Sequence, residues 1–337
     1  MKIVRTDREL QTPRLDAALT AAGHELVLLP DGLPEDDLIF ACAEADLLLM
    51  CYTPITRRVI ESAAHLKGIV KYGVGIDAID IPAAIDHGIT VVNIPEYAEE
   101  TVAEGAFALM IALAKKLTQL NTHMAETGWA WPEPTWLGSD IAGKTVGIIG
   151  LGKIGRSMAR MSGAGFRARV IAYSPHTSKA EMREHGVEKI DNLHDLLGQS
   201  DFVTIHSVLN DETHGLIGEA ELRAMKHTAF LINVSRGAIV DETALVRAIS
   251  EGWIAGAGLD VFSQEPLTRN GHPLSPLFDH PNVILSPHLT FYTEQAMQRL
   301  EDETLARCLE VLEGRNVQIA SSDPRLRAQT KGVTFVT

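Results

Sequence analysis

The stretch VGIIGLGKIGRSMAR, residues 146–160, decides the fold of this chain. An apolar run leads into a turn with three glycines, and a helix-like pattern follows. This order is typical of a dinucleotide-binding βαβ unit: the first glycine permits a sharp turn, the second lets the backbone approach a pyrophosphate, and the third lets the helix pack on its strand. Backbone N–H groups at the helix start would face the phosphates. The predicted phosphate-binding residues are Gly150, Gly152, Lys153, Ile154 and Gly155.

Apolar runs alternate with helix-like segments on both sides of this stretch, which predicts parallel sheets of the α/β class. The length of 337 residues suits two domains. We expect two lobes, each a doubly wound parallel sheet. A Rossmann-type dinucleotide-binding domain is expected over residues 101–289, and a flavodoxin-like domain over residues 1–100 together with 290–337.

The composition excludes several classes of protein. Hydrophobic residues make up 45% and charged residues 22%, as in a globular protein, and no apolar run is long enough to span a bilayer. The formal charge of −14 repels nucleic acid. The N-terminus looks like a first strand and not like an export signal, so a cytoplasmic location is expected. Three cysteines without metal-ligand spacing predict reduced packing residues.

Two segments near the start of the predicted cofactor domain are unusual. Residues 100–120 predict one long helix, apolar on most of its circumference and therefore buried on several sides. The segment GWAWPEPTWLG, residues 128–138, is rich in Trp and Pro and is expected to be irregular. It is either a loop folded onto its own surface or an arm packed on a second subunit, where large aromatic residues are favoured. The tail from Ala320 onward has no assignment.

Polar residues follow the apolar runs of the predicted cofactor domain. Ligands of open α/β sheets lie at the carboxyl ends of the strands, so these residues are the candidates for a site. They are Ser174, His206, Arg236, Asp260 and His288, with Glu265 shortly after Asp260.

Arg236, Glu265 and His288 form a chemically sufficient set for reduction of a 2-oxo acid. A guanidinium can hold a carboxylate and an adjacent oxygen in bidentate fashion. An imidazole with a carboxylate partner has its tautomer fixed and can transfer a proton near neutral pH. No metal is expected, because His206 and His288 have no partners at ligand spacing.

The chain resembles the D-isomer-specific 2-hydroxyacid dehydrogenases over nearly its whole length. The matching pieces are YGVGIDAID (72–80), VGIIGLGKIG (146–155), LINVSRGAIVDETAL (231–245), GAGLDVFSQEP (256–266) and SPH (286–288).

The resemblance implies a role for each site residue. Arg236 anchors the substrate's carboxylate and carbonyl oxygen, His288 is the acid/base, and Glu265 supports His288. Asp260 contacts the nicotinamide carboxamide, and backbone at Val74 and Gly75 completes carboxylate binding. The resemblance further implies that the domain of residues 1–100 and 290–337 binds substrate, that the lobes close around it, and that the enzyme is a homodimer.

Two departures from the family pattern affect these expectations. Ser174 stands where NAD-dependent members carry an acidic residue for the ribose hydroxyls, so a charge that would repel a 2′-phosphate is missing. No arginine, the usual phosphate clamp, is there either. NAD(H) is slightly favoured because it is the more frequent cofactor of the family, and NADP(H) stays open. The sequence HLTFYTEQA (288–296) adds aromatic bulk where many members have small residues. It is similar to C-terminal binding protein corepressors, so a dinucleotide-sensing binding protein without significant turnover is the alternative to a dehydrogenase.

The segment 128–138 is similar to that of glyoxylate/hydroxypyruvate reductases, which makes glyoxylate or hydroxypyruvate the working substrate. Lys71, just before the YGVGIDAID glycine loop, could meet a second anionic group of the substrate or could be solvated at a strand end. The chain ends too soon for the regulatory domain common in phosphoglycerate dehydrogenases. Formate dehydrogenases of this fold carry Gln at the position of Glu265, which disfavours formate.

Overall fold

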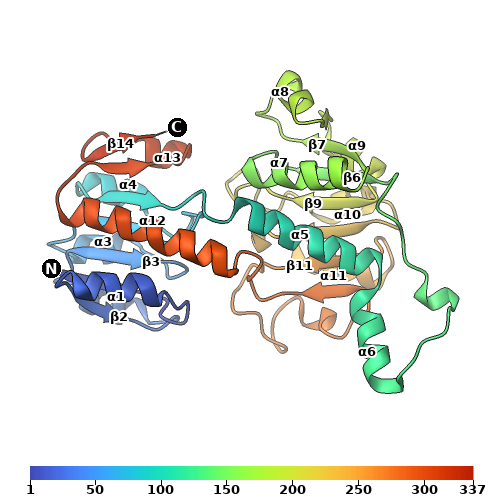
Figure 1. The fold of residues 1–337 in the computed structure, drawn as a ribbon, viewed down its shortest axis with the longest axis horizontal. Coiled ribbons are helices and arrows are strands. Elements are labelled where there is room, and N and C mark those ends of the chain that lie inside the picture. Colours follow the sequence, from blue (N-terminus) through green and yellow to red (C-terminus); the bar gives the residue numbers. More distant parts are fainter. Residues whose placement is uncertain (337) are drawn as a thin grey trace. The chain divides into compact units, whose positions relative to one another are not determined.

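The computed structural model describes residues 1–336, which separate into two compact units. The first unit comprises Met1–Ala98 and the chain from Thr293 onward, and the second comprises Glu99–Tyr292. Both units are built on parallel sheets with helices packed on them (Figure 1). The expected α/β class, with two parallel sheets, is confirmed.

The first unit has a five-stranded parallel sheet in the order β2-β1-β3-β4-β5, which is the flavodoxin-like order. The strands β3 and β4 are buried along their whole length, as parallel strands covered on both faces require. The strands are β1 (Lys2–Arg5), β2 (Glu25–Leu28), β3 (Leu47–Met50), β4 (Gly68–Lys71) and β5 (Thr90–Asn93). The helices between them are α1 (Pro13–Ala21), α2 (Glu35–Cys42), α3 (Arg57–Ser62) and α4 (Ile81–Asp86).

The C-terminal chain completes this unit. Helix α12 (Glu294–Leu312) contacts α1, β3 and β4 and lies along the sheet in Figure 1. The tail, unassigned from sequence, forms α13 (Pro324–Arg327) and a parallel pair of β13 (Val317–Ile319) with β14 (Val333–Phe335). Gln329 anchors the tail, because its side chain accepts from the N–H and donates to the carbonyl of Val91, in β5.

The second unit has a seven-stranded parallel sheet in the order β12-β11-β10-β9-β6-β7-β8. Taken in chain order, these strands follow the Rossmann arrangement, with the reversal point between β6 and β9. The strands are β6 (Thr145–Ile149), β7 (Arg169–Tyr173), β8 (Glu188–Lys189), β9 (Phe202–Ile205), β10 (Phe230–Asn233), β11 (Gly256–Leu259) and β12 (Val283–Leu285). The helices are α5 (Glu99–Ala114), α6 (Leu117–Thr127), α7 (Lys153–Arg160), α8 (Lys179–Glu184), α9 (Leu193–Gln199), α10 (Glu219–Ala224) and α11 (Glu242–Ser250).

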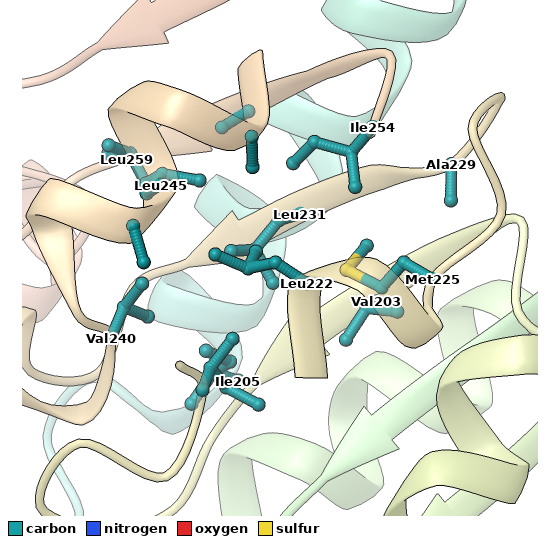
Figure 2. Close-up of a cluster of buried hydrophobic side chains, with 14 of the residues drawn as sticks. Val203, Ile205, Leu222, Met225, Ala229, Leu231, Val240, Leu245, Ile254 and Leu259 are labelled. Atoms are coloured by element: carbon teal, nitrogen blue, oxygen red, sulfur yellow. The ribbon is translucent and has the colours of Figure 1, made fainter. Parts of the chain in front are cut away.

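Alternate residues of these strands enter two apolar cores, one on each face of the sheet. Val203 and Leu231 belong to the core beneath α10 and α11, which Figure 2 shows, while Phe202 and Ile232 belong to the core beneath α5 and α7. Because strand side chains alternate in direction, both faces must be covered by helices. This leaves the strand ends and their loops as the places where polar side chains can gather.

The prediction of one helix over residues 100–120 is wrong, because the chain forms α5 and α6 with a break between them. Lys116 adopts a left-handed conformation with φ of 53°. At the break, Ser139 donates its N–H to the carbonyl of Ala114 at 2.7 Å, so the returning chain satisfies an acceptor that the end of α5 leaves free. Helix α5 is buried on several faces as expected, whereas α6 has no buried residue.

The segment 128–138 is irregular as expected, apart from a 3-10 turn at Pro134–Trp136. Trp129 and Trp131 are 60% and 72% exposed and contact each other edge to face. Trp136 is less exposed and packs on His123 of α6. Within one chain the segment therefore leaves two of its three indoles exposed, and both alternatives, a loop folded onto its own surface and an arm on a second subunit, stay predictions.

Candidate active site

The glycine turn lies at the reversal point of the seven-stranded sheet. Gly150 has φ of 91°, and a Cβ there would come within 2.7 Å of the Ser207 nitrogen. A Cβ on Gly155 would lie 2.3 Å from the carbonyl oxygen of Gly150, so helix α7 packs directly on the turn. A Cβ on Gly152, by contrast, would meet nothing within 4 Å. The turn therefore has open space at Gly152, the N-cap of α7, where the first backbone N–H groups of the helix have no partner within the helix. A pyrophosphate fits this position.

Ser174 directly follows β7, and its hydroxyl lies 2.9 Å from that of Thr177. Lys189 donates to the Thr177 carbonyl at 2.8 Å and so ties this loop to β8. No carboxylate directly follows β7, in contrast to the ribose site of many NAD-binding proteins. The loop therefore presents hydroxyl groups, which do not repel a 2′-phosphate.

His206 directly follows β9 beside the glycine turn. Its Nε2 lies 2.9 Å from the Thr204 hydroxyl, and burial lowers the pKa of His206 to about 3. The Nδ1 atom is enclosed and has no hydrogen-bond partner within the described chain. The ring is therefore neutral at physiological pH and leaves one nitrogen unsatisfied at the dinucleotide end of the sheet.

Asp260 directly follows β11 and is fully buried. Its Oδ1 accepts from the N–H of Leu289 at 3.0 Å. Its Oδ2 accepts from the N–H of Thr290 at 3.0 Å and from the Thr290 hydroxyl at 2.6 Å. The carboxylate thus holds the loop that begins at His288. The backbone of His288 has φ of 57°, in the left-handed region. A non-glycine residue keeps such a conformation only when its surroundings impose it.

His288 and Glu265 form a hydrogen-bonded pair beyond the ends of the neighbouring strands β12 and β11. The Nδ1 of His288 lies 2.8 Å from Oε2 of Glu265, whose Oε1 accepts from the N–H of Phe262 at 2.9 Å. Burial on its own would raise the pKa of Glu265. The hydrogen bond and charge of His288, the Phe262 N–H and the charge of Arg236 outweigh burial and hold that pKa below its usual value.

Arg236 follows β10, the next strand in the sheet, and its charge contributes to the low pKa of Glu265. Its backbone is fixed by Asn233, whose amide donates to the Arg236 carbonyl at 2.9 Å. The structure therefore brings Arg236, Glu265 and His288 to one edge of one sheet. A guanidinium for a carboxylate and an imidazole whose Nδ1 is held by a carboxylate are the groups that 2-oxo acid reduction requires.

The remaining predicted residues lie in the first unit: Lys71 ends β4, and Val74 and Gly75 follow it. Asn93 donates to the Val74 carbonyl at 2.6 Å, which orients the loop containing Val74 and Gly75. Lys71 is only 6% exposed, and its ammonium donates to the Cys51 carbonyl and lies 3.2 Å from the Cys51 thiol. The low exposure contradicts solvation at the strand end. Contact with a second anionic group of the substrate stays a prediction.

Several residues that hold the site were missed by sequence reasoning. Asn93 and Asn233 each orient a site loop through a side-chain amide, and Glu242 holds the loop that carries Glu265 through Ser263. Asn233 and Glu242 lie within the motif of residues 231–245, which is their only signal in the sequence. Asn93 and Glu242 bind residues distant in the chain, so their contacts cannot be identified from a short stretch. Within residues 1–336, no group of three or more His, Cys, Asp or Glu residues could hold a metal ion. No described helix has the length and hydropathy needed to cross a bilayer.

Comparison with known proteins agrees with this geometry. The family model "D-isomer specific 2-hydroxyacid dehydrogenase, NAD binding domain" matches residues 107–290. A glyoxylate reductase from Korarchaeum cryptofilum is 41% identical over 283 residues, covering 82% of this chain and 83% of that protein. The chain belongs to the D-isomer specific 2-hydroxyacid dehydrogenase family. The resemblance inferred from sequence, including the glyoxylate reductase branch, is confirmed.

Other relatives of this D-2-hydroxyacid dehydrogenase differ in length and ligand. A D-3-phosphoglycerate dehydrogenase from Methanocaldococcus jannaschii is 35% identical over 89% of this chain but only 56% of its own length. The crystal structure of Aquifex aeolicus D-lactate dehydrogenase with NAD and lactic acid has a TM-score of 0.82 and 28% identity, over 93% of this chain and 96% of that one. An acyclic imino acid reductase, Bsp5, solved with NADPH and D-Arg, has a TM-score of 0.81 and 28% identity, covering 93% and 97%.

This dehydrogenase is therefore an oxidoreductase that uses a nicotinamide dinucleotide and acts on D-2-hydroxy acids or their 2-oxo forms. The corepressor-like alternative finds no support in these relatives.

Proposed function

We propose that this enzyme reduces glyoxylate or hydroxypyruvate, with Arg236, Glu265 and His288 as its catalytic residues. The observation that carries the proposal is the contact between Nδ1 of His288 and Oε2 of Glu265, with the charge of Arg236 close by. Arg236 binds the substrate carboxylate through its planar donors. Glu265 holds the Nδ1 proton, which directs Nε2 of His288 toward the carbonyl oxygen, where it delivers a proton.

The cofactor would be held by the second unit. Gly150, Gly152, Lys153, Ile154 and Gly155 would surround the pyrophosphate, and Ser174 would lie near the ribose. His206 and Asp260 would belong to the same site, Asp260 by holding the loop at Thr290, because its buried carboxylate accepts from that loop. When bound, the reduced nicotinamide supplies the hydride for the carbonyl carbon. We favour NAD(H) slightly, since no arginine that could bind a 2′-phosphate directly follows β7. NADP(H) stays open, since the loop offers hydroxyls there and no carboxylate.

The first unit would bind the substrate carboxylate through backbone at Val74 and Gly75. One observation favours a small substrate with a single anionic group. The Lys71 side chain is 6% exposed, and its ammonium already donates to the Cys51 carbonyl.

We further propose a cytoplasmic homodimer joined by the arm, defined as α6 and the segment 128–138. The arm carries large exposed apolar side chains, which are Leu117, Met124, Trp129, Trp131 and Leu137. Such a set is favoured at subunit interfaces. Replacement of Trp129 and Trp131 by Ser should shift the mass measured by light scattering from dimer toward monomer. A wild-type monomer would refute this part. The three cysteines are free and buried, which fits a reducing compartment.

A substrate panel tests the proposed reaction. Glyoxylate, hydroxypyruvate, pyruvate and 3-phosphohydroxypyruvate are each assayed with NADH and NADPH by loss of reduced-nicotinamide absorbance. We expect the highest kcat/KM with glyoxylate or hydroxypyruvate. A preference for the phosphorylated acid or for pyruvate would contradict the substrate assignment but leave the catalytic residues in place.

A further inference from the structure

The loop that carries Glu265 is held from behind by a second buried carboxylate. Glu242, the first residue of α11, is 7% exposed. Its Oε1 accepts from the N–H of Ser263 at 2.7 Å and its Oε2 accepts from the Ser263 hydroxyl at 2.5 Å. Both oxygens of one carboxylate thus bind one residue of the loop 261–266, close to Glu265. Glu242 thus fixes both the backbone and the side chain of Ser263.

The same loop also touches the segment that carries Arg236. A Cβ added to Gly237 would lie 2.0 Å from the carbonyl carbon of Phe262 and 2.2 Å from the nitrogen of Ser263. No side chain fits there, so the two backbones are in direct contact. Glu242 follows shortly after Gly237 in the chain. The backbone of Glu242 therefore continues the segment that carries Arg236, while its carboxylate binds the loop that carries Glu265.

His272 encloses this carboxylate on another side. Its side chain is 3% exposed, and its Nδ1 accepts from the N–H of Leu274 at 3.1 Å. Its Nε2 lies 3.7 Å from Oε2 of Glu242 and has no hydrogen-bond partner in the described part of the chain. A carboxylate in such surroundings is costly to separate from its donors. Glu242 and Ser263 are therefore tightly coupled in position.

We propose that Glu242 is a positioning residue for catalysis. It braces the loop 261–266 against the Arg236 segment and thereby keeps Oε2 of Glu265 within hydrogen-bond distance of His288. Glu242 acts through Glu265 and not on the substrate. The inference rests on the proposed catalytic role of Glu265. A displacement of about 1 Å at reacting groups can reduce a rate about 100-fold, so loss of the brace should be visible in kcat.

A double-mutant cycle with Glu242→Ala and Glu265→Gln tests this coupling in the full-length enzyme. Glu242→Ala should lower kcat about 10- to 100-fold when Glu265 is present. In the Glu265→Gln background the same change should lower kcat by less than about 3-fold, because residues that act through one another are not additive. The Kd for the reduced dinucleotide, measured by fluorescence titration, should stay within about 2-fold, since the brace lies outside the glycine turn.

Three variants separate positioning from a general loss of stability. Glu301 is the matched control, because it is also a buried Glu whose carboxylate accepts a backbone N–H, that of Leu15 at 2.8 Å, in the first unit. Glu301→Ala should lower Tm but leave kcat unchanged. Glu242→Gln can still bond Ser263 through an amide and should restore most of kcat. If Glu242→Ala does not fold, Ser263→Ala takes its place in the cycle.

Either of two results would contradict the positioning role of Glu242. One is a wild-type kcat in Glu242→Ala. The other is an equal loss of kcat from Glu242→Ala with Glu265 present and with Glu265→Gln. Full kcat in Glu265→Gln alone is a different result. It would refute the proposed role of Glu265 itself, and with it the basis of this inference.

Discussion

The imidazole Nδ1 of His288 lies 2.8 Å from Oε2 of Glu265. The two residues come from loops after β12 and β11, which are neighbours in the sheet. The pKa of Glu265 is below its usual value, so the carboxylate is ionised at neutral pH and accepts the Nδ1 proton. Only Nε2 is then left to exchange a proton with a substrate, which is the arrangement that a general acid requires.

Replacement of His288 by Ala should lower kcat for 2-oxo acid reduction by a factor of about 10² to 10⁴, because proton transfer is lost. The Kd for the dinucleotide should not change, since the glycine turn is untouched. His176, whose side chain is 85% exposed, provides a control as His176→Ala. Steady-state kinetics showing near-wild-type turnover in the His288 variant would exclude its role as the acid.

Replacement of Arg236 by Lys keeps the charge but removes the planar pair of donors. We expect KM for the 2-oxo acid to rise and kcat to fall, because a lysine cannot hold a carboxylate and an adjacent oxygen together. Arg269→Lys, at an exposed arginine paired with Asp279, is the matched control. An unchanged kcat/KM would mean that the carboxylate is bound elsewhere.

Replacement of Ser174 by Asp should make the enzyme select NADH over NADPH. A carboxylate at the end of β7 would accept the ribose hydroxyls of NADH and repel the 2′-phosphate of NADPH. We expect the ratio of kcat/KM for NADH to that for NADPH to increase at least about 10-fold, corresponding to about 1.4 kcal/mol. The hydroxyl-conserving Ser174→Thr variant should leave the ratio near wild type. If the ratio does not move in Ser174→Asp, the ribose lies away from this residue.

The low pKa of His206 should make stability depend on pH. Its pKa in the folded protein is about 3, whereas an unfolded histidine titrates near pH ~6.5. Between these values the unfolded chain binds a proton that the folded chain does not, so stability falls as pH decreases from about 6.5 toward 3.

The variant His206→Gln cannot bind this proton, so its Tm should depend less on pH between about 6.5 and 4 than that of the wild type. Thermal unfolding monitored by circular dichroism measures the slope. His176→Gln should retain the wild-type slope, because that side chain is exposed. Equal slopes in the wild type and His206→Gln would show that the ring titrates normally in the folded state.

The amino-acid sequence by itself determined the fold class, because local patterns carry it. The buried runs of parallel strands, the glycine turn before α7 and the polar residues at strand ends can all be identified from short stretches of sequence. The strand-end rule also placed Arg236, Glu265 and His288 at one edge of a sheet, since parallel neighbours end on the same side.

The tertiary structure alone decided how these groups are held. Three contacts are examples. Ala114 accepts from Ser139 at the end of α5, Lys71 donates to the Cys51 carbonyl, and Asp260 accepts from the N–H of Thr290. Each of these contacts joins residues far apart or in separate elements, and the partner of a buried polar group leaves no periodic trace in the sequence. Periodicity reports which face of an element is buried, whereas hydrogen-bond partners are chosen only when the elements pack together.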